Sequence, residues 1–338
     1  MKEILEQMKL WAVQNKPMVL ARVIQTWGSS PRPVGSSMLI SGDLEMAGSV
    51  SGGCVEGAVV KEAKLILGSK NGKRLSYGVS DDDAWAVGLS CGGQIQVYLQ
   101  PLSPKKKVEE KLLQCLTEDK SCILVTALID GESRNTLIIP GGDKFGDELP
   151  NEALQKSLDA FEKRKQENLT IGDTQYFIHV FPKRSQMIII GAAHITVDLV
   201  QLAHEFDFET IVIDPRSAFA KNTTFTVRPD QIIEKYPSQV LNDFELGSHT
   251  YAVILSHDPK IDDDALKILL KKNVAYIGAL GSKKNHEKRI ARLLEKGFTA
   301  DDIARIDAPI GIDIHARGAK EIALSIMGAV IKAKNAFQ

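Results

Sequence analysis

Short apolar runs alternate with helix-like segments along the second half of the chain. Residues 186–190 are almost wholly apolar and are followed by glycine, which is typical of a strand buried on both faces of a parallel sheet. Residues 195–206 then carry apolar side chains at the spacing of an amphipathic helix. The alternation continues, with strands predicted at 210–213, 251–255 and 274–278 and helices at 264–272, 284–294 and 319–334. The pattern therefore predicts a Rossmann-like, doubly wound parallel sheet.

The first half of the chain has a less regular pattern that contains more strands than helices. Strands are predicted at 18–24, 38–40, 94–99, 123–128, 135–139 and 174–181, and helices at 1–11, 55–67 and 151–168. Pro182-Lys183-Arg184-Ser185 separates the two patterns and is the best linker candidate. The predicted fold class is therefore α/β, with an N-terminal mixed α+β domain over residues 1–183 and the Rossmann-like domain over residues 186–338.

Composition narrows the class of protein without identifying it. The 338 residues carry a formal net charge of −1, which gives no global field for nucleic acid or an anionic membrane. No apolar run approaches the roughly 18 residues of a membrane span, and the charged N-terminus does not resemble a signal peptide. Four cysteines without disulfide-scaffold spacing fit a reducing compartment. We therefore expect a cytoplasmic protein that binds neither nucleic acid nor membrane.

Two cysteines each lie beside a pair of glycines. One is Cys54 in the run Gly48-Ser49-Val50-Ser51-Gly52-Gly53-Cys54-Val55-Glu56, directly before the helix predicted at 55–67. Backbone N–H groups at a helix start lack intrahelical partners, favour anions and lower the pKa of a nearby thiol. This position therefore suits either a bound phosphate or a reactive thiolate. The other is Cys91, which with Gly92 and Gly93 opens the strand predicted at 94–99.

These motifs resemble those of the XdhC/CoxI family, the accessory proteins of molybdenum hydroxylases such as xanthine dehydrogenase and carbon monoxide dehydrogenase. The loop around Arg32, Gly28-Ser29-Ser30-Pro31-Arg32-Pro33-Val34-Gly35, is similar to the first motif of that family. The resemblance implies binding of molybdenum cofactor (molybdopterin), with support for its sulfuration and its insertion into a hydroxylase apo-enzyme. It also implies a cysteine desulfurase as the sulfur donor.

The resemblance assigns the candidate site to the N-terminal domain. Cys54 and Cys91 are the candidate catalytic thiols, which would contact the pterin dithiolene or carry a persulfide. The alternative for each is a small buried residue that only packs in the core. The candidate cofactor-binding residues are Arg32, Ser51, Gly52, Gly53, Cys54, Glu56, Cys91, Gly92 and Gly93. Glu56 would accept hydrogen bonds from a pterin amine or simply stabilise the helix dipole, and Arg32 would bind a phosphate or remain solvated. We expect no structural zinc, because no four-ligand set has suitable spacing.

The Rossmann-like domain retains only part of the dinucleotide-binding fingerprint. Of three expected glycines only Gly191 is present, and Ala193 and Val197 occupy the other two positions. Asp214 would bind a ribose hydroxyl or cap the following turn, and His194 would face a ligand or pack. The domain is therefore predicted either to bind NAD(P) or another nucleotide through these residues, or to dock partners.

The last family-like motif departs from the family pattern at two positions, of which Ile312 in place of leucine is the milder. Residues 308–316 resemble Pro-Ile-Gly-Leu-Asp-Ile-Gly-Ala, with His315 in place of the second glycine. This replacement matters if the position needs a positive φ or a close approach of the backbone.

The leading hypothesis is an accessory protein that does not turn over substrate by itself. An alternative is an NAD(P)-dependent oxidoreductase that uses the Rossmann-like domain and a reactive thiol. A third is a protein that handles persulfide without molybdenum. A homodimer is expected because two-fold dimers are the commonest oligomers.

Overall fold

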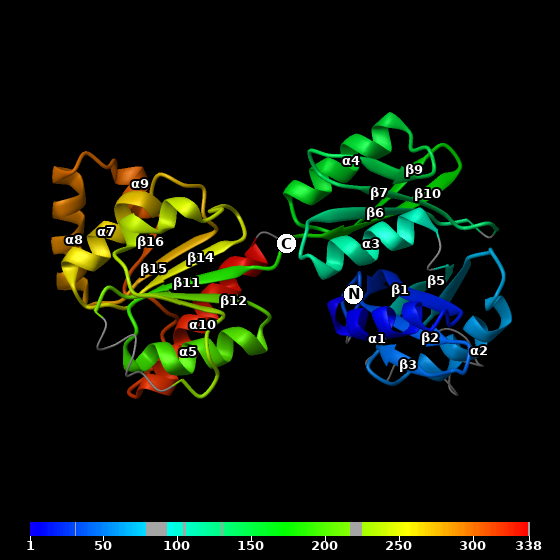
Figure 1. Cartoon of the computed structure of the whole chain (residues 1–338), viewed down its shortest axis with the longest axis horizontal. Helices are drawn as coiled ribbons and strands as arrows, with labels where there is room; N and C mark the ends of the chain where they lie inside the picture. The colour runs from blue at the N-terminus through cyan, green and yellow to red at the C-terminus, as the bar shows by residue number, and fades with distance from the viewer. Residues whose placement is uncertain (31, 79–92, 104–105, 130, 217–224, 337–338) are drawn as a thin grey trace. The chain divides into compact units, whose positions relative to one another are not determined.

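The computed structural model describes the chain except for residues 31, 79–92, 104–105, 130, 217–224 and 337–338 (Figure 1). The chain divides into two compact units, Met1–Lys183 and Arg184–Gln338. The first contains two antiparallel sheets and the second a parallel sheet. This confirms the predicted fold class of a mixed α+β part followed by a Rossmann-like part.

The first sheet of unit 1 has five antiparallel strands with a helix on each face. Their order is β3 (Met46–Gly48), β2 (Ser37–Ser41), β1 (Met18–Trp27), β5 (Gln94–Leu102) and β4 (Lys73–Tyr77). Helix α2 (Glu56–Ile66) packs Val59 and Ala63 on one face, against Val23 and Val97 among others. Helix α1 (Lys2–Val13) covers the other face through Ile4, Met8 and Trp11. Both helices bury the apolar stripe that their sequence spacing predicts.

The second sheet of unit 1 repeats this arrangement. Its strand order is β8 (Lys144–Gly146), β7 (Arg134–Ile138), β6 (Cys122–Ala127), β10 (Thr174–Phe181) and β9 (Glu167–Ile171). Helix α3 (Lys107–Thr117) packs on one face and α4 (Asn151–Glu162) on the other. The helix predicted over 151–168 is wrong at its end. Arg164 takes a φ of +53°, which stops the helix, and the following residues alternate in exposure as a strand does.

Unit 2 is a six-stranded sheet in which all pairs are parallel. The order is β13 (Gln231–Ile233), β12 (Glu209–Ile213), β11 (Gln186–Ile190), β14 (Thr250–Ile254), β15 (Tyr276–Ala279) and β16 (Ile306–Asp307). Helices α5 (His194–Glu205) and α10 (Ala319–Ala336) cover one face. Helices α7 (Pro259–Leu269), α8 (Lys283–Glu295) and α9 (Ala300–Ala304) cover the other (Figure 1). Helices on both faces of a parallel sheet make the unit doubly wound.

The described residues contain neither a candidate membrane span nor a candidate metal cluster. None of their helices combines the length and the apolar character of a membrane span. No group of three or more His, Cys, Asp or Glu side chains among them is arranged to hold a metal ion.

Candidate functional site

The three loops that carry the N-terminal motifs begin and end at one edge of the first sheet. We name them the Arg32 loop (residues 28–36), the Cys54 loop (49–55) and the Cys91 loop (78–93). The strand register places the start of β2 beside the end of β3, and the end of β1 beside the start of β5. The end of β4 also pairs with the start of β5. All three loops therefore leave the sheet at the same side, although they are far apart in sequence.

Gly93, directly before β5, packs against the Arg32 loop. A Cβ atom at Gly93 would lie 2.2 Å from the carbonyl oxygen of Ser29 and 3.0 Å from that of Trp27. Only glycine fits at this position, because the clash is with backbone that cannot rotate away. Gly93 therefore brings two of the three motif loops into contact. Cys91 and Gly92 lie outside the described residues.

The Cys54 loop is organised around the carboxylate of Glu56, the first residue of α2. Both oxygens accept several hydrogen bonds from the loop. Oε1 accepts from Ser49 Oγ at 2.7 Å and from the backbone N–H of Ser51 at 2.8 Å, and Oε2 accepts from the N–H of Gly53 at 2.9 Å. Further donors are Ser51 Oγ and the N–H groups of Val50 and Gly52. The carboxylate thus binds a ring of donors as a bound anion would.

Two glycines allow the loop to adopt this shape. Gly52 and Gly53 have φ values of +81° and +119°, a region that other residues rarely enter, and there their N–H groups turn toward Glu56. Burial alone would raise the pKa of Glu56, but the hydrogen bonds from Ser51 and Ser49 outweigh it and lower that pKa to about 2. Glu56 is therefore a carboxylate at neutral pH, and its acceptor sites are occupied by its own chain. A hydrogen bond from a pterin amine to Glu56 stays a prediction.

Cys54 lies two residues before α2, in the last turn of this loop. Its side chain is half-buried and packs at the margin of the core that includes Val50, Val55 and Val59. A Cβ atom added to the neighbouring Gly53, or to Gly57 in the first turn of α2, would meet no described atom within 4 Å. Among the described residues, nothing therefore contacts the loop on this side of the thiol. The role of the thiol itself stays a prediction.

Arg32 is directed toward helix α1. Its Nη2 forms an ion pair with Glu3, while its Nε is buried and has no acceptor among the described residues. The Ser30 hydroxyl donates a hydrogen bond to the Arg32 carbonyl oxygen at 2.9 Å, which stiffens the loop. The side chain is therefore ordered, and one of its donors remains for a ligand. Phosphate binding by Arg32 stays a prediction.

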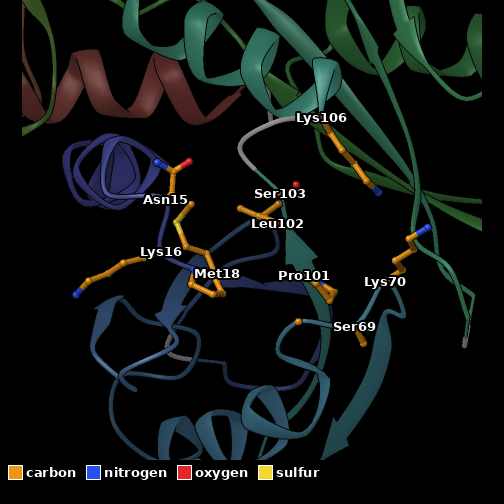
Figure 2. Close-up of a pocket in the computed structure, with 11 residues that line it drawn as sticks. Asn15, Lys16, Met18, Ser69, Lys70, Pro101, Leu102, Ser103 and Lys106 are labelled. Carbon is orange, nitrogen blue, oxygen red and sulfur yellow. The ribbon is translucent and has the colours of Figure 1, made fainter.

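A separate pocket lies elsewhere in unit 1. It has a volume of about 390 Å³ and is lined by Met18, Pro101, Leu102, Lys70 and Lys106, among others (Figure 2). Met18 begins β1 and pairs with Leu102 at the end of β5, so the pocket lies at the edge opposite the motif loops. The pocket and the motif site are therefore separate features of one sheet.

In unit 2, Asp214 is fully buried at the end of β12 and binds its own chain. It accepts hydrogen bonds from the backbone N–H of Ala192 at 2.8 Å and from two nitrogens of the Arg216 guanidinium at 2.9 and 2.7 Å. Burial would raise its pKa, but Arg216 outweighs this effect and lowers it. Arg216 also donates to the carbonyl oxygen of Ser256, beyond the end of β14. Asp214 thus connects two turns at the carboxyl edge of the sheet, and ribose binding stays a prediction.

The remaining predicted residues of unit 2 lie at the same edge. A Cβ atom at Gly191 would come within 2.7 Å of the Ser256 backbone, so this glycine permits close packing of two strand ends. His194 is the first residue of α5 and is exposed. Arg216 is not among the predicted site residues, although its spacing of two residues from Asp214 is a usable signal for a local ion pair. His315 has a φ of +56°, so the position where the family has glycine does need the left-handed region.

Comparison with known proteins identifies the family. The model of the XdhC Rossmann domain matches residues 187–330, and the model of the XdhC and CoxI family matches residues 11–78. The chain is 30% identical over 321 residues to a protein of Bacillus subtilis (strain 168) named as a probable subunit of xanthine dehydrogenase, covering 94% of this chain and 93% of that protein. The chain belongs to the XdhC and CoxI family. The predicted resemblance is thereby confirmed.

Two more relatives of this XdhC/CoxI chain are similar along nearly its whole length. One is a protein of Escherichia coli (strain K12) named molybdenum cofactor insertion chaperone PaoD, 25% identical, with 94% of this chain and 84% of that protein covered. The other is a crystal structure titled as a xanthine dehydrogenase from Bacillus halodurans, 27% identical with a TM-score of 0.77. The similarity covers 99% of this chain and 96% of that one. The Arg32 and Cys54 loops both lie inside the XdhC and CoxI match.

Proposed function

We propose that this chain binds molybdenum cofactor as cargo and delivers it to a molybdenum hydroxylase of the xanthine dehydrogenase type. The relative from Escherichia coli that is named a molybdenum cofactor insertion chaperone supports this proposal, because it aligns with nearly the whole chain. The convergence of the three motif loops at one sheet edge supports it as well.

The observation that carries the proposal is the ordered Cys54 loop. Glu56 holds the loop by accepting hydrogen bonds from its N–H and hydroxyl groups, and no described atom lies within 4 Å of the Cβ position of Gly53, next to the thiol. A half-buried thiol on an ordered loop loses little conformational entropy when it binds a ligand. In the proposed complex, Cys54 and Cys91 contact the dithiolene end of the cofactor, and Arg32 binds its phosphate.

The proposal extends to sulfur transfer. Either thiolate would take the terminal sulfur of a desulfurase persulfide, which releases the desulfurase thiolate and leaves a persulfide on this chain. Passing that sulfur to the bound cofactor at the sulfide level would take two electrons from an external thiol reductant, and the oxygen that it replaces would leave as water. Cyanide-labile sulfur on the isolated protein that depends on Cys54 or Cys91 would support this step. Its absence after incubation with a desulfurase and free cysteine would restrict the function to binding and insertion.

Retention of the cofactor tests the proposal directly. Purified protein mixed with molybdenum cofactor and passed over a desalting column should carry molybdenum with it. Cys54→Ala and Cys91→Ala should each weaken binding by about tenfold, which corresponds to losing one contact of about 1.4 kcal/mol. Cys115→Ala is the matched control, because this cysteine is buried under the second sheet of unit 1 and should not affect retention.

The outcome separates the proposal from the oxidoreductase alternative. No retention by the wild-type chain, together with tight binding of NADH, would replace the proposal with a nucleotide-dependent activity of unit 2. The contacts of Asp214 with Ala192 and Arg216 argue against that alternative, since ribose would have to displace them.

A further inference from the structure

Arg22 is a cation placed wholly inside unit 1. It lies in β1, is 0% exposed, and points toward the second sheet, where its Nη2 donates to Thr126 Oγ1 of β6 at 2.8 Å. The same nitrogen donates to Gln100 Oε1 of β5 at 2.7 Å. The ring of Phe177 of β10 lies 5.6 Å from the guanidinium carbon. The side chain therefore occupies the interior where strands of both sheets meet.

The charge of Arg22 has no counter-ion among the described residues. Its Nε and Nη1 atoms are buried and have no hydrogen-bond acceptor, which leaves three N–H donors unsatisfied. Its two acceptors, an amide and a hydroxyl, are neutral. Burial lowers the pKa of Arg22 to about 10, which still leaves it charged at neutral pH. Isolated buried charges are rare in proteins because desolvation is costly. We therefore expect a group of opposite charge next to Arg22.

A further buried nitrogen without a hydrogen-bond partner lies next to Arg22. His179 of β10 is 4% exposed, and its Nδ1 is buried without a partner. The imidazole stands between Phe177 and Phe181, with ring centroids at 5.5 and 4.2 Å. Burial and the charge of Arg22 keep its pKa well below 6.5, so the ring is neutral and carries one proton. That proton is available to an acceptor if it resides on Nδ1.

We propose that a small inorganic anion of the size of chloride binds inside unit 1, with Nε–H and Nη1–H of Arg22 and Nδ1–H of His179 as its donors. Water would satisfy hydrogen bonds but would leave the charge of Arg22 uncompensated. The residues that contact Arg22, namely Gln100, Thr126 and Phe177, are all buried, which limits the proposal to a small anion. No carboxylate supplies this charge in the described part of unit 1.

The site also borders the Arg32 loop. A Cβ atom at Gly35 would lie 3.3 Å from Nε2 of His179, so the loop backbone rests against the same imidazole. The anion thus fixes the ring on one side while the loop contacts it on the other. This inference does not depend on what the motif loops bind.

Thermal unfolding of the full chain tests the proposal with chloride as the probe. Melting temperatures would be compared in sodium chloride and in sodium methanesulfonate at equal ionic strength, because methanesulfonate is too bulky for the site. Above the dissociation constant, each tenfold increase in chloride should raise the melting temperature by about 3–5 °C. Equal melting temperatures in the two salts at all concentrations would overturn the proposal.

Variants and bromide identify the site. Arg22→Met should abolish the difference between the salts, whereas Arg74→Met should retain it, because Arg74 is half-buried and donates to the carbonyl oxygen of Leu128. If Arg22→Met does not fold, crystals of the wild-type chain soaked in bromide decide the question. An anomalous peak between Arg22 and His179 supports the proposal, and a water molecule there without anomalous signal contradicts it.

Discussion

Glu56 provides, within its own chain, the anion around which the Cys54 loop folds. Replacing it with glutamine removes the charge and turns an amide group toward N–H donors. We expect Glu56→Gln to lower the free energy of unfolding by about 1–3 kcal/mol, the range for hydrogen bonds to a charged group. Urea unfolding of both proteins at pH 7 measures this change in the free energy of unfolding. Glu62→Gln in the same helix is the control, because Glu62 forms a partly exposed pair with Lys73 and should contribute less than about 1 kcal/mol.

The stabilising effect of Glu56 should disappear in acid. Its pKa is about 2 in the folded chain, against 4.5 as the ordinary value, so the unfolded chain takes up the proton first as pH falls. The contribution is complete above pH 4.5 and is lost as pH falls from 4.5 toward 2. Because the side chain is partly exposed, we expect about 1–2 kcal/mol after allowing for solvent screening. A difference between wild type and Glu56→Gln that stays constant from pH 7 to pH 3 would contradict this assignment.

At the scale of elements, the ends of β11 and β14 pack too closely for any side chain at Gly191. Its φ is +110°, and a Cβ atom would lie 2.7 Å from both the nitrogen and the Cα of Ser256. Gly191→Ala should therefore lower the free energy of unfolding by about 2–4 kcal/mol through backbone strain and overlap. Gly247→Ala in the same unit should change it by less than about 0.5 kcal/mol, since its Cβ would meet only ordinary contacts at 3.6 Å. Equal effects of the two substitutions in urea unfolding would refute this explanation.

Elements with a long apolar pattern were predictable, and short edge elements were not. The strand predicted at 174–181 matches β10, and the helix predicted at 55–67 matches α2 to within one residue at each end. Strands β3, β8 and β13 have three residues each and expose most of them, so no apolar run marks them. The predicted helix 151–168 overran because nothing in the residue type of Arg164 indicates its left-handed conformation.

For the whole molecule, the sequence motifs identified the loops, and the sheet order explains why the strand ends that carry them lie at one side of the sheet. The order β3-β2-β1-β5-β4 pairs strands that lie up to about 80 residues apart, and such non-local pairing leaves no local signal in the sequence. Glu56 was likewise only partly predictable, because the sequence indicated its position at a helix start but not its contacts. Its six hydrogen bonds to the preceding loop depend on two positive φ values that only the folded chain displays.

Unit 2 should fold without unit 1. All six strands of its sheet come from Arg184–Gln338, and the two cores on the faces of that sheet are built from residues of the same segment. We expect a fragment of residues 184–338 to unfold in urea in one cooperative transition with native-like circular dichroism. A fragment of residues 194–338 is the matched control. It lacks β11, which pairs with both β12 and β14, so it should lose cooperative unfolding. If the longer fragment is also unfolded while the full chain is folded, then the parallel sheet depends on contacts with unit 1 and its cores are not sufficient for its stability.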